Sequence, residues 1–166
     1  LDKVDIISST FGKALGGASG GFISASKNIV DTLRQKSRPY LFSNSLAPAL
    51  VVACLKAIDI NSKNKNLILK LHDNTTYFRN QIKEIGYEIK GDSHPIVPIM
   101  IYDAKQAVAL SEMLLEENIY VIPFSFPVVP KGQARIRVQL SSSHTKEQLQ
   151  HSIRAFKECG KALNII

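Results

Sequence analysis

The first part of the chain contains two short apolar runs, followed by apolar residues at helical spacing. The runs at residues 4–8 and 22–25 each have the length of a β-strand, and we expect two strands there. Ser26 is a suitable N-cap for the helix that follows. This helix is expected to end near Arg38, because Pro39 disfavours the helical conformation in the residue before it.

A loop and a second helix are predicted next. Residues 40–45 are expected to form the loop. Pro48 suits the first turn of a helix, where its missing N–H is not needed. Apolar positions at helical spacing continue to Ile58, and the pattern ends in the polar residues 61–64. We therefore expect a domain boundary in this region and divide the chain after residue 56.

The pattern after this boundary is typical of a small α/β sandwich domain with about four strands and three helices. Pro98 lies within one predicted strand and places it at a sheet edge or at a bulge. Strands are predicted at residues 87–89, 96–102, 119–122 and 134–140, and helices at residues 67–85, 107–115 and 145–163.

Two local patterns in this region are particularly clear. Residues 134–140 alternate, so that the apolar side chains share one face of a strand and Arg135 and Arg137 share the other. Thr145 and Gln148 have the spacing of a capping box at the start of the last helix.

Composition excludes several classes of protein. The chain has 166 residues, 45% hydrophobic and 21% charged, which predicts a folded protein and not a disordered one. Its longest mostly apolar run, residues 46–55, is shorter than the roughly 20 residues that span a membrane, so no membrane partner is expected. The two cysteines lie far apart, which excludes a disulfide scaffold and indicates a reducing compartment.

The net charge of +7 permits a nucleic-acid partner but does not predict one. Lysine and arginine are scattered among acidic residues and form no run of five. A small acidic ligand, such as a phosphate or an acyl-CoA, would be attracted by the same charge. We expect no nucleic acid.

The glycine-rich segment at residues 10–21 holds the first candidate for chemistry, Lys13. The phosphate-loop pattern fails here, because Ile7 stands at its first glycine position and Ala14 follows the lysine. A lysine on an open backbone, one turn after the Thr10 hydroxyl, suits a Schiff base with a phosphorylated cofactor. The alternative is a solvent-exposed lysine in a glycine-rich hairpin.

Three motifs resemble the α-oxoamine synthases, which are acyl-CoA:amino-acid acyltransferases that use pyridoxal 5′-phosphate (PLP) and have the aspartate-aminotransferase-like fold. The motifs are T-F-G-K-A-L-G-G at residues 10–17, R-Q-K-S-R-P-Y-L-F-S-N-S-L-A-P at 34–48, and G-Q-A-R-I-R at 132–137 followed by S-S-S-H-T at 141–145. The resemblance covers essentially the whole chain. It implies an α/β fold in which residues 1–56 end the large PLP-binding domain and residues 57–166 form the small C-terminal domain.

The resemblance also implies roles for individual residues. Lys13 would form the Schiff base with PLP and then remove a proton from the amino-acid substrate. Thr10 would bind the PLP phosphate. Ser43 and Asn44 would reach the phosphate of the cofactor in the other subunit, so that a homodimer would share its active sites.

An arginine is expected to bind the carboxylate of the amino acid, since its planar fork of N–H donors matches that anion. The strand alternation cannot choose between Arg135 and Arg137, which point to the same side. The resemblance chooses Arg137. The alternative for either residue is an ordinary surface arginine.

The branch of the family with the most similar motifs condenses glycine with acetyl-CoA to 2-amino-3-ketobutyrate and CoA; the reverse direction belongs to threonine degradation. The resemblance implies a cytoplasmic enzyme, or a mitochondrial one in a eukaryote. The acid that pairs with the pyridine nitrogen and the histidine that stacks on the ring would precede Leu1, so the chain is expected to be part of a longer polypeptide and inactive alone. Another α-oxoamine synthase and a non-catalytic α/β module remain alternatives.

A metal site is not expected. His144, Glu147 and His151 could share one helix face, at positions i, i+3 and i+7, but structural metal sites usually need four ligands. Helix capping and a solvent-exposed face account for these residues better.

Overall fold

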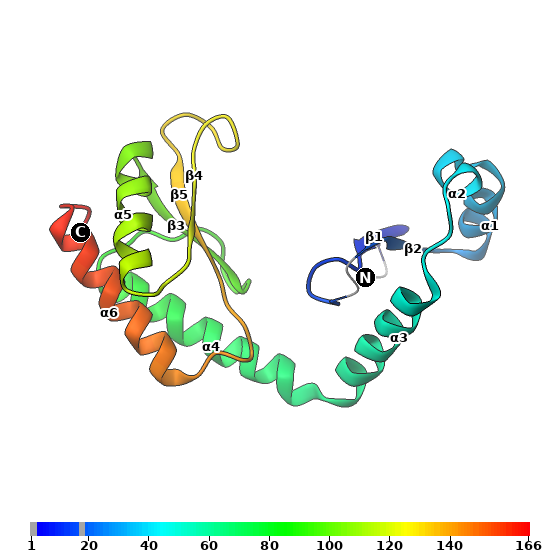
Figure 1. Ribbon diagram of the computed structural model, residues 1–166, viewed down its shortest axis with the longest axis horizontal. Coiled ribbons are helices and arrows are strands. Elements are labelled where there is room, and N and C mark those ends of the chain that lie inside the picture. Colours follow the sequence, from blue (N-terminus) through cyan, green and yellow to red (C-terminus); the bar gives the residue numbers. More distant parts are fainter. Residues whose placement is uncertain (1–2, 17–18) are drawn as a thin grey trace. The chain divides into compact units, whose positions relative to one another are not determined.

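The computed structural model describes residues 3–16 and 19–166 and divides into two compact units, Leu1–Lys65 and Asn66–Ile166 (Figure 1). The division lies later than the boundary expected after residue 56, which falls inside helix α3 (Pro48–Lys63). The polar residues at the end of α3 still make helical hydrogen bonds, and the N–H of Asn64 donates to the carbonyl of Ile60 at 3.0 Å. Loss of apolar periodicity therefore preceded the true end of the helix.

The first unit begins with an antiparallel pair of strands, β1 (Ile6–Thr10) and β2 (Gly21–Ala25). Strand β2 confirms the prediction, whereas β1 begins two residues later than expected. Thr10 pairs with Gly21 at the end of the ladder, and the N–H of Phe11 donates to the carbonyl of Gly20 at 3.0 Å. The glycine-rich segment is thus the loop of a β-hairpin.

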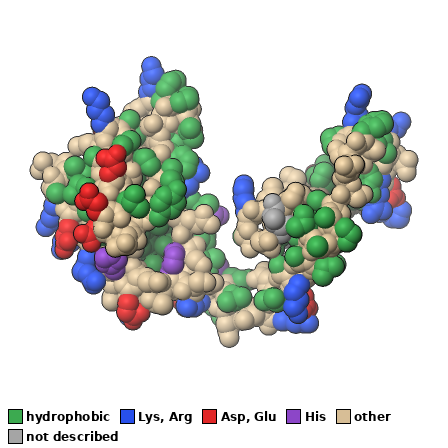
Figure 2. Space-filling view, in the orientation of Figure 1, with side chains coloured by type: hydrophobic (Ala, Val, Ile, Leu, Met, Phe, Trp, Pro, Cys, Tyr) green, Lys and Arg blue, Asp and Glu red, His purple; other side chains and the backbone are tan. Residues whose placement is uncertain are grey.

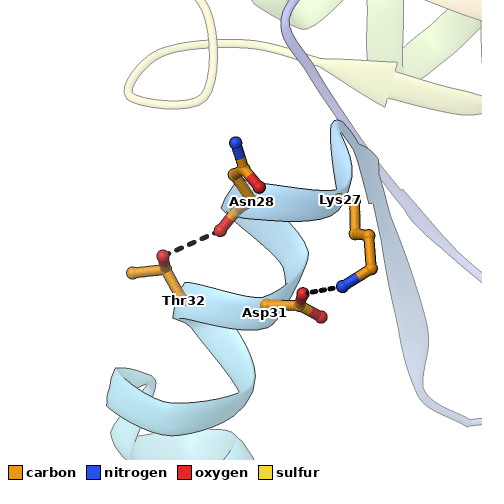
Figure 3. A network of polar contacts seen from close by, with 4 residues as sticks. All are labelled: Lys27, Asn28, Asp31 and Thr32. Carbon is orange, nitrogen blue, oxygen red and sulfur yellow. Dashed lines mark hydrogen bonds and ion pairs between the residues drawn. The ribbon is translucent and has the colours of Figure 1, made fainter.

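Helix α1 (Lys27–Lys36) follows the hairpin directly. Ser26 is its N-cap residue, as predicted, but the Ser26 side chain makes no capping hydrogen bond. The first turns are held by an ion pair between Lys27 and Asp31 and by a 2.8 Å hydrogen bond from the Thr32 hydroxyl to the carbonyl of Asn28 (Figure 3).

Helix α2 (Arg38–Phe42) corrects the prediction of a loop after Pro39. Pro39 lies in the first turn of α2, where a proline N–H would have no helical acceptor in any case. The proline therefore ends α1 and permits a new helix at the same place. Helix α3 starts at Pro48, as expected.

The second unit contains an antiparallel sheet of three strands in the order β3–β5–β4, with bounds Ile96–Tyr102, Ala134–Gln139 and Ile122–Phe124 respectively. Strand β3 is an edge strand, which agrees with the position of Pro98. Two predictions were wrong in detail. Residues 87–89 form only an isolated bridge between Ile89 and Ile99, and β4 begins at Ile122 where the prediction ended.

Three helices supply the other layer of this unit: α4 (Lys65–Glu84), α5 (Ala104–Glu116) and α6 (Lys146–Ala162). All three were predicted from their apolar spacing. Their buried side chains form one core with those of β3 and β5. This core contains Phe78, Ile82, Leu110, Leu114, Phe156, Val97, Ile99 and Ile136 among others.

The alternation predicted for residues 134–140 is confirmed. Ala134, Ile136 and Leu140 are buried in the core, while Arg135 is half-buried and Arg137 is exposed. Among the residues that the structure describes, no helix is both long and apolar enough to cross a bilayer.

Candidate functional site

Lys13 lies in the hairpin loop between β1 and β2, and Thr10 is the last residue of β1. The N–H of Gly16 donates to the carbonyl of Lys13 at 2.9 Å, so Lys13 begins a tight turn, and Gly16 has the positive φ of +66° that glycine adopts easily. Thr10 and Lys13 are both exposed. Gly17 of the same motif and Ala18 lie outside the described residues.

The amine of Lys13 is accessible. Of the ion pairs made within residues 3–16 and 19–166, those of lysine involve Lys27, Lys56 and Lys63, and none involves Lys13. Lys27 differs, because it is also exposed in the same unit but forms an ion pair with Asp31 (Figure 3). The Lys13 amine is therefore available to an incoming ligand.

The base of the hairpin requires glycine for steric reasons. A Cβ atom on Gly21 would lie 2.5 Å from the carbonyl oxygen of Ser9, which no side chain tolerates. Gly20 has a φ of +84°. These two glycines let the strands close tightly behind the loop that carries Lys13.

Ser43 and Asn44 follow helix α2 and are both exposed. The N–H of Ser43 donates to the carbonyl of Pro39 at 3.1 Å and closes the helix, and Asn44 lies in the connection to α3. In the described part of the first unit, no hydrogen bond links either side chain to Thr10 or Lys13. The structure thus brings Thr10 and Lys13 together on one hairpin and places Ser43 and Asn44 on a separate segment.

The two candidate arginines differ in their surroundings, although they share a face of β5. Arg135 is bound to Gln133, through a 3.1 Å hydrogen bond from Nε to the Gln133 carbonyl and a 3.2 Å bond from Nη2 to Oε1. The Cζ atom of Arg137 lies 4.1 Å from the centre of the Phe124 ring. Within the described residues, the Arg137 guanidinium makes no hydrogen bond or ion pair. Its N–H donors are therefore free, which favours Arg137 as the anion-binding residue.

Arg137 also lines a cavity of about 510 Å³ in the second unit, beside the start of α6. His144 and His151 line the same cavity. The Nδ1 atom of His144 accepts a 3.2 Å hydrogen bond from the N–H of Ser141, and Nε2 of His151 lies 2.9 Å from the carbonyl of Glu117. The His144 imidazole thus holds the turn before α6, and the His151 imidazole links α6 to the end of α5.

The contact between Phe124 and Arg137 was not predicted from the sequence. The predicted strand stopped at Ile122, so Phe124 was not placed beside β5. The run Ile122–Phe124 ends in an aromatic residue, which is a signal for a strand that continues. The partner of Phe124, however, depends on the register between β4 and β5, which is a long-range property.

Comparison with known proteins finds similarity over the whole chain. The 2-amino-3-ketobutyrate coenzyme A ligase of Escherichia coli K12 is 49% identical over 166 residues, and the match covers 100% of the chain and 42% of that protein. The human mitochondrial protein of the same name is 47% identical over 161 residues, 97% of the chain and 38% of its own length. The 8-amino-7-oxononanoate synthase of Petrotoga mobilis is 45% identical over 165 residues, 99% of the chain and 42% of its length. The chain thus spans less than half the length of these relatives.

Solved structures also match the chain over nearly its whole length. The serine palmitoyltransferase of Sphingomonas wittichii matches with a TM-score of 0.92 and 29% identity, over 98% of the chain and 41% of that protein. A high-resolution structure of SPT with PLP matches with a TM-score of 0.93 and 27% identity, over 98% of the chain and 41% of its own. The model of the family called aminotransferase class I and II matches residues 2–156. The chain therefore belongs to the aminotransferase class I and II family and has its PLP-dependent transferase fold.

Proposed function

We propose that the protein containing this chain is a PLP-dependent glycine C-acetyltransferase, which condenses glycine with acetyl-CoA to give 2-amino-3-ketobutyrate and CoA. The observation that carries this proposal is the accessible Lys13 in the loop of a glycine-closed hairpin. The identity of 49% with 2-amino-3-ketobutyrate coenzyme A ligase supports the choice of substrates. The reverse reaction would place the enzyme in threonine degradation.

The residues of the first unit fit PLP. The donor set comprises the amine of Lys13, the hydroxyl of Thr10, the hydroxyl of Ser43 and the amide of Asn44, all exposed. Among the described residues, Lys13 forms no ion pair. Lys13 would hold the cofactor covalently through Nζ, and the Thr10 hydroxyl would hydrogen-bond its phosphate. Ser43 and Asn44 would reach the phosphate of the cofactor held by the second subunit. Bound PLP would supply an electron sink for negative charge at the α-carbon of the amino acid.

The chain's own residues would then divide the remaining work. Lys13 would take the proton from the α-carbon of glycine through Nζ. Arg137 would hold the glycine carboxylate through its unpaired N–H donors. Ser43 and Asn44 would act on the cofactor of the second subunit, which makes the proposed enzyme a homodimer with shared active sites. The proposed compartment is the cytoplasm in a bacterium and the mitochondrion in a eukaryote, which agrees with the mitochondrial mammalian relatives.

Borohydride trapping tests the central role of Lys13. The full-length protein is incubated with PLP and reduced, and the pyridoxyl label is mapped by peptide mass spectrometry. We expect a single label on Lys13 and a loss of kcat/KM of at least about 10²–10⁴-fold in Lys13→Ala, the usual contribution of a general base. Lys27→Ala is the matched control, since Lys27 is exposed but paired with Asp31, and it should keep both label and activity.

A folded full-length protein without a label on Lys13 would contradict the catalytic proposal and favour a non-catalytic α/β module. A label on Lys13 without any product from glycine and acetyl-CoA would keep the catalytic proposal but contradict the proposed substrates. The second candidate is therefore another α-oxoamine synthase, favoured by the 45% identity with 8-amino-7-oxononanoate synthase. Assays that pair alanine or serine with longer acyl-CoA thioesters distinguish the two.

A further inference from the structure

The pairing of β4 with β5 places Phe124 next to Arg137 on the face of the sheet that carries both arginines. Ile122 lies directly opposite Arg137, and Phe124 directly opposite Arg135. Phe124 and Arg137 are thus diagonal neighbours, two positions apart, which long and aromatic side chains can bridge. The 4.1 Å distance from the Arg137 Cζ to the ring centre is well within the roughly 6 Å limit of a cation–π contact.

The other cross-strand neighbours of Arg137 are apolar. Pro98 pairs with Arg137 from β3, and Ile122 pairs with it from β4. Within residues 3–16 and 19–166, no carboxylate forms an ion pair with Arg137. Within the described residues, the contact with the Phe124 ring is thus the interaction recorded for the Arg137 guanidinium, whose N–H donors make no hydrogen bond.

We infer that Phe124 is a positioning residue that orients Arg137 for a planar carboxylate, and so contributes to recognition of the amino-acid substrate. This inference rests on the proposed function, because it takes the carboxylate of glycine as the ligand. The attraction between an aromatic face and a guanidinium restricts the positions that the guanidinium takes. An aliphatic side chain of similar volume would fill the same space without that restriction.

The test compares Phe124→Leu with Phe124→Tyr in the full-length, PLP-loaded protein. We expect Phe124→Leu to raise the KM for glycine about three- to tenfold, the size of a partly exposed cation–π contact, and to leave the KM for acetyl-CoA unchanged. Phe124→Tyr keeps the ring and should keep the KM for glycine. Phe126→Leu is the matched control: the Phe126 ring contacts a different cation, the Lys131 amine at 5.2 Å, and the variant should behave as the parent.

Arg137→Ala distinguishes the carboxylate-binding role of Arg137 from the positioning role of Phe124. If Arg137→Ala leaves the KM for glycine unchanged, the proposed carboxylate role of Arg137 fails. If Arg137→Ala raises that KM but Phe124→Leu does not, the positioning role of Phe124 is overturned. In the Arg137→Ala background, Phe124→Leu should have no further effect on the KM. If Phe124→Leu does not fold, Phe124→Met serves as the second ring-free variant, with the same expected rise.

Discussion

At the scale of single residues, Tyr87 couples the stability of the second unit to alkaline pH. Its side chain is buried, and its hydroxyl donates a 2.9 Å hydrogen bond to the carbonyl of Phe156 in α6. Burial, and secondarily the nearby Cys159 thiol, raises the pKa of Tyr87 above its ordinary value of 10.0. An acid whose pKa is raised by folding stabilises the protein below the unfolded pKa, and that stability is lost as the pH rises through the folded value.

We predict that Tyr87→Phe lowers the free energy of unfolding by about 0.5–1.5 kcal/mol at pH 7, through the lost hydrogen bond. The variant should also lose less stability than the parent above about pH 10, because the buried ionisable group is gone. Urea unfolding at pH 7 and at about pH 10.5 measures both effects. Tyr120→Phe is the control, since Tyr120 is 78% exposed and its substitution should change neither value. Equal alkaline losses in Tyr87→Phe and parent would contradict the assignment.

At the scale of elements, the start of α6 depends on a reciprocal cap. The N–H of Gln148 donates to the Thr145 hydroxyl at 3.3 Å, and the N–H of Thr145 donates to the Gln148 side chain at 2.9 Å. We predict that Thr145→Ala lowers the free energy of unfolding by about 1 kcal/mol, because helix N–H groups lose an acceptor. Ser26→Ala at the start of α1 should change it by much less, since the Ser26 side chain makes no capping bond. Thermal unfolding of the two variants compares them; similar losses would show that the Thr145 hydroxyl has no special role.

The capping box and the strand alternation were predictable from the sequence, whereas the register between paired strands was not. The capping box of Thr145 and the alternation of 134–140 follow from neighbouring residues, and both were confirmed. The start of β4 depends on the register with β5, to which it is paired through Ile122 and Phe124. The same distinction applies to the candidate site. The motif around Lys13 can be recognised in the sequence, whereas the different surroundings of Arg135 and Arg137 come from contacts across strands.

At the scale of the whole molecule, the two units differ in how much apolar surface they bury. Of the buried hydrophobic side chains in the described residues, Cys54 alone belongs to the first unit. Large apolar side chains lie at the surface of this unit, as Figure 2 shows, and Phe42 is 79% exposed. The second unit contains a single continuous core. Since apolar burial must offset the conformational entropy lost on folding, the second unit has the means to fold by itself and the first does not.

We therefore predict that residues 66–166, produced alone, give a cooperative thermal transition and slow amide exchange in α4, α5 and α6. Residues 1–65, produced alone, should show no cooperative transition and should bind a dye that reports exposed apolar surface. Circular dichroism and hydrogen exchange measure both pieces. Ile136→Ala in the second piece is the control. Because Ile136 is fully buried, this substitution should lower the free energy of unfolding by about 2–5 kcal/mol and clearly lower the transition temperature. A cooperative transition in the first piece would contradict this prediction, and it would mean that the Lys13 hairpin is stabilised within its own unit.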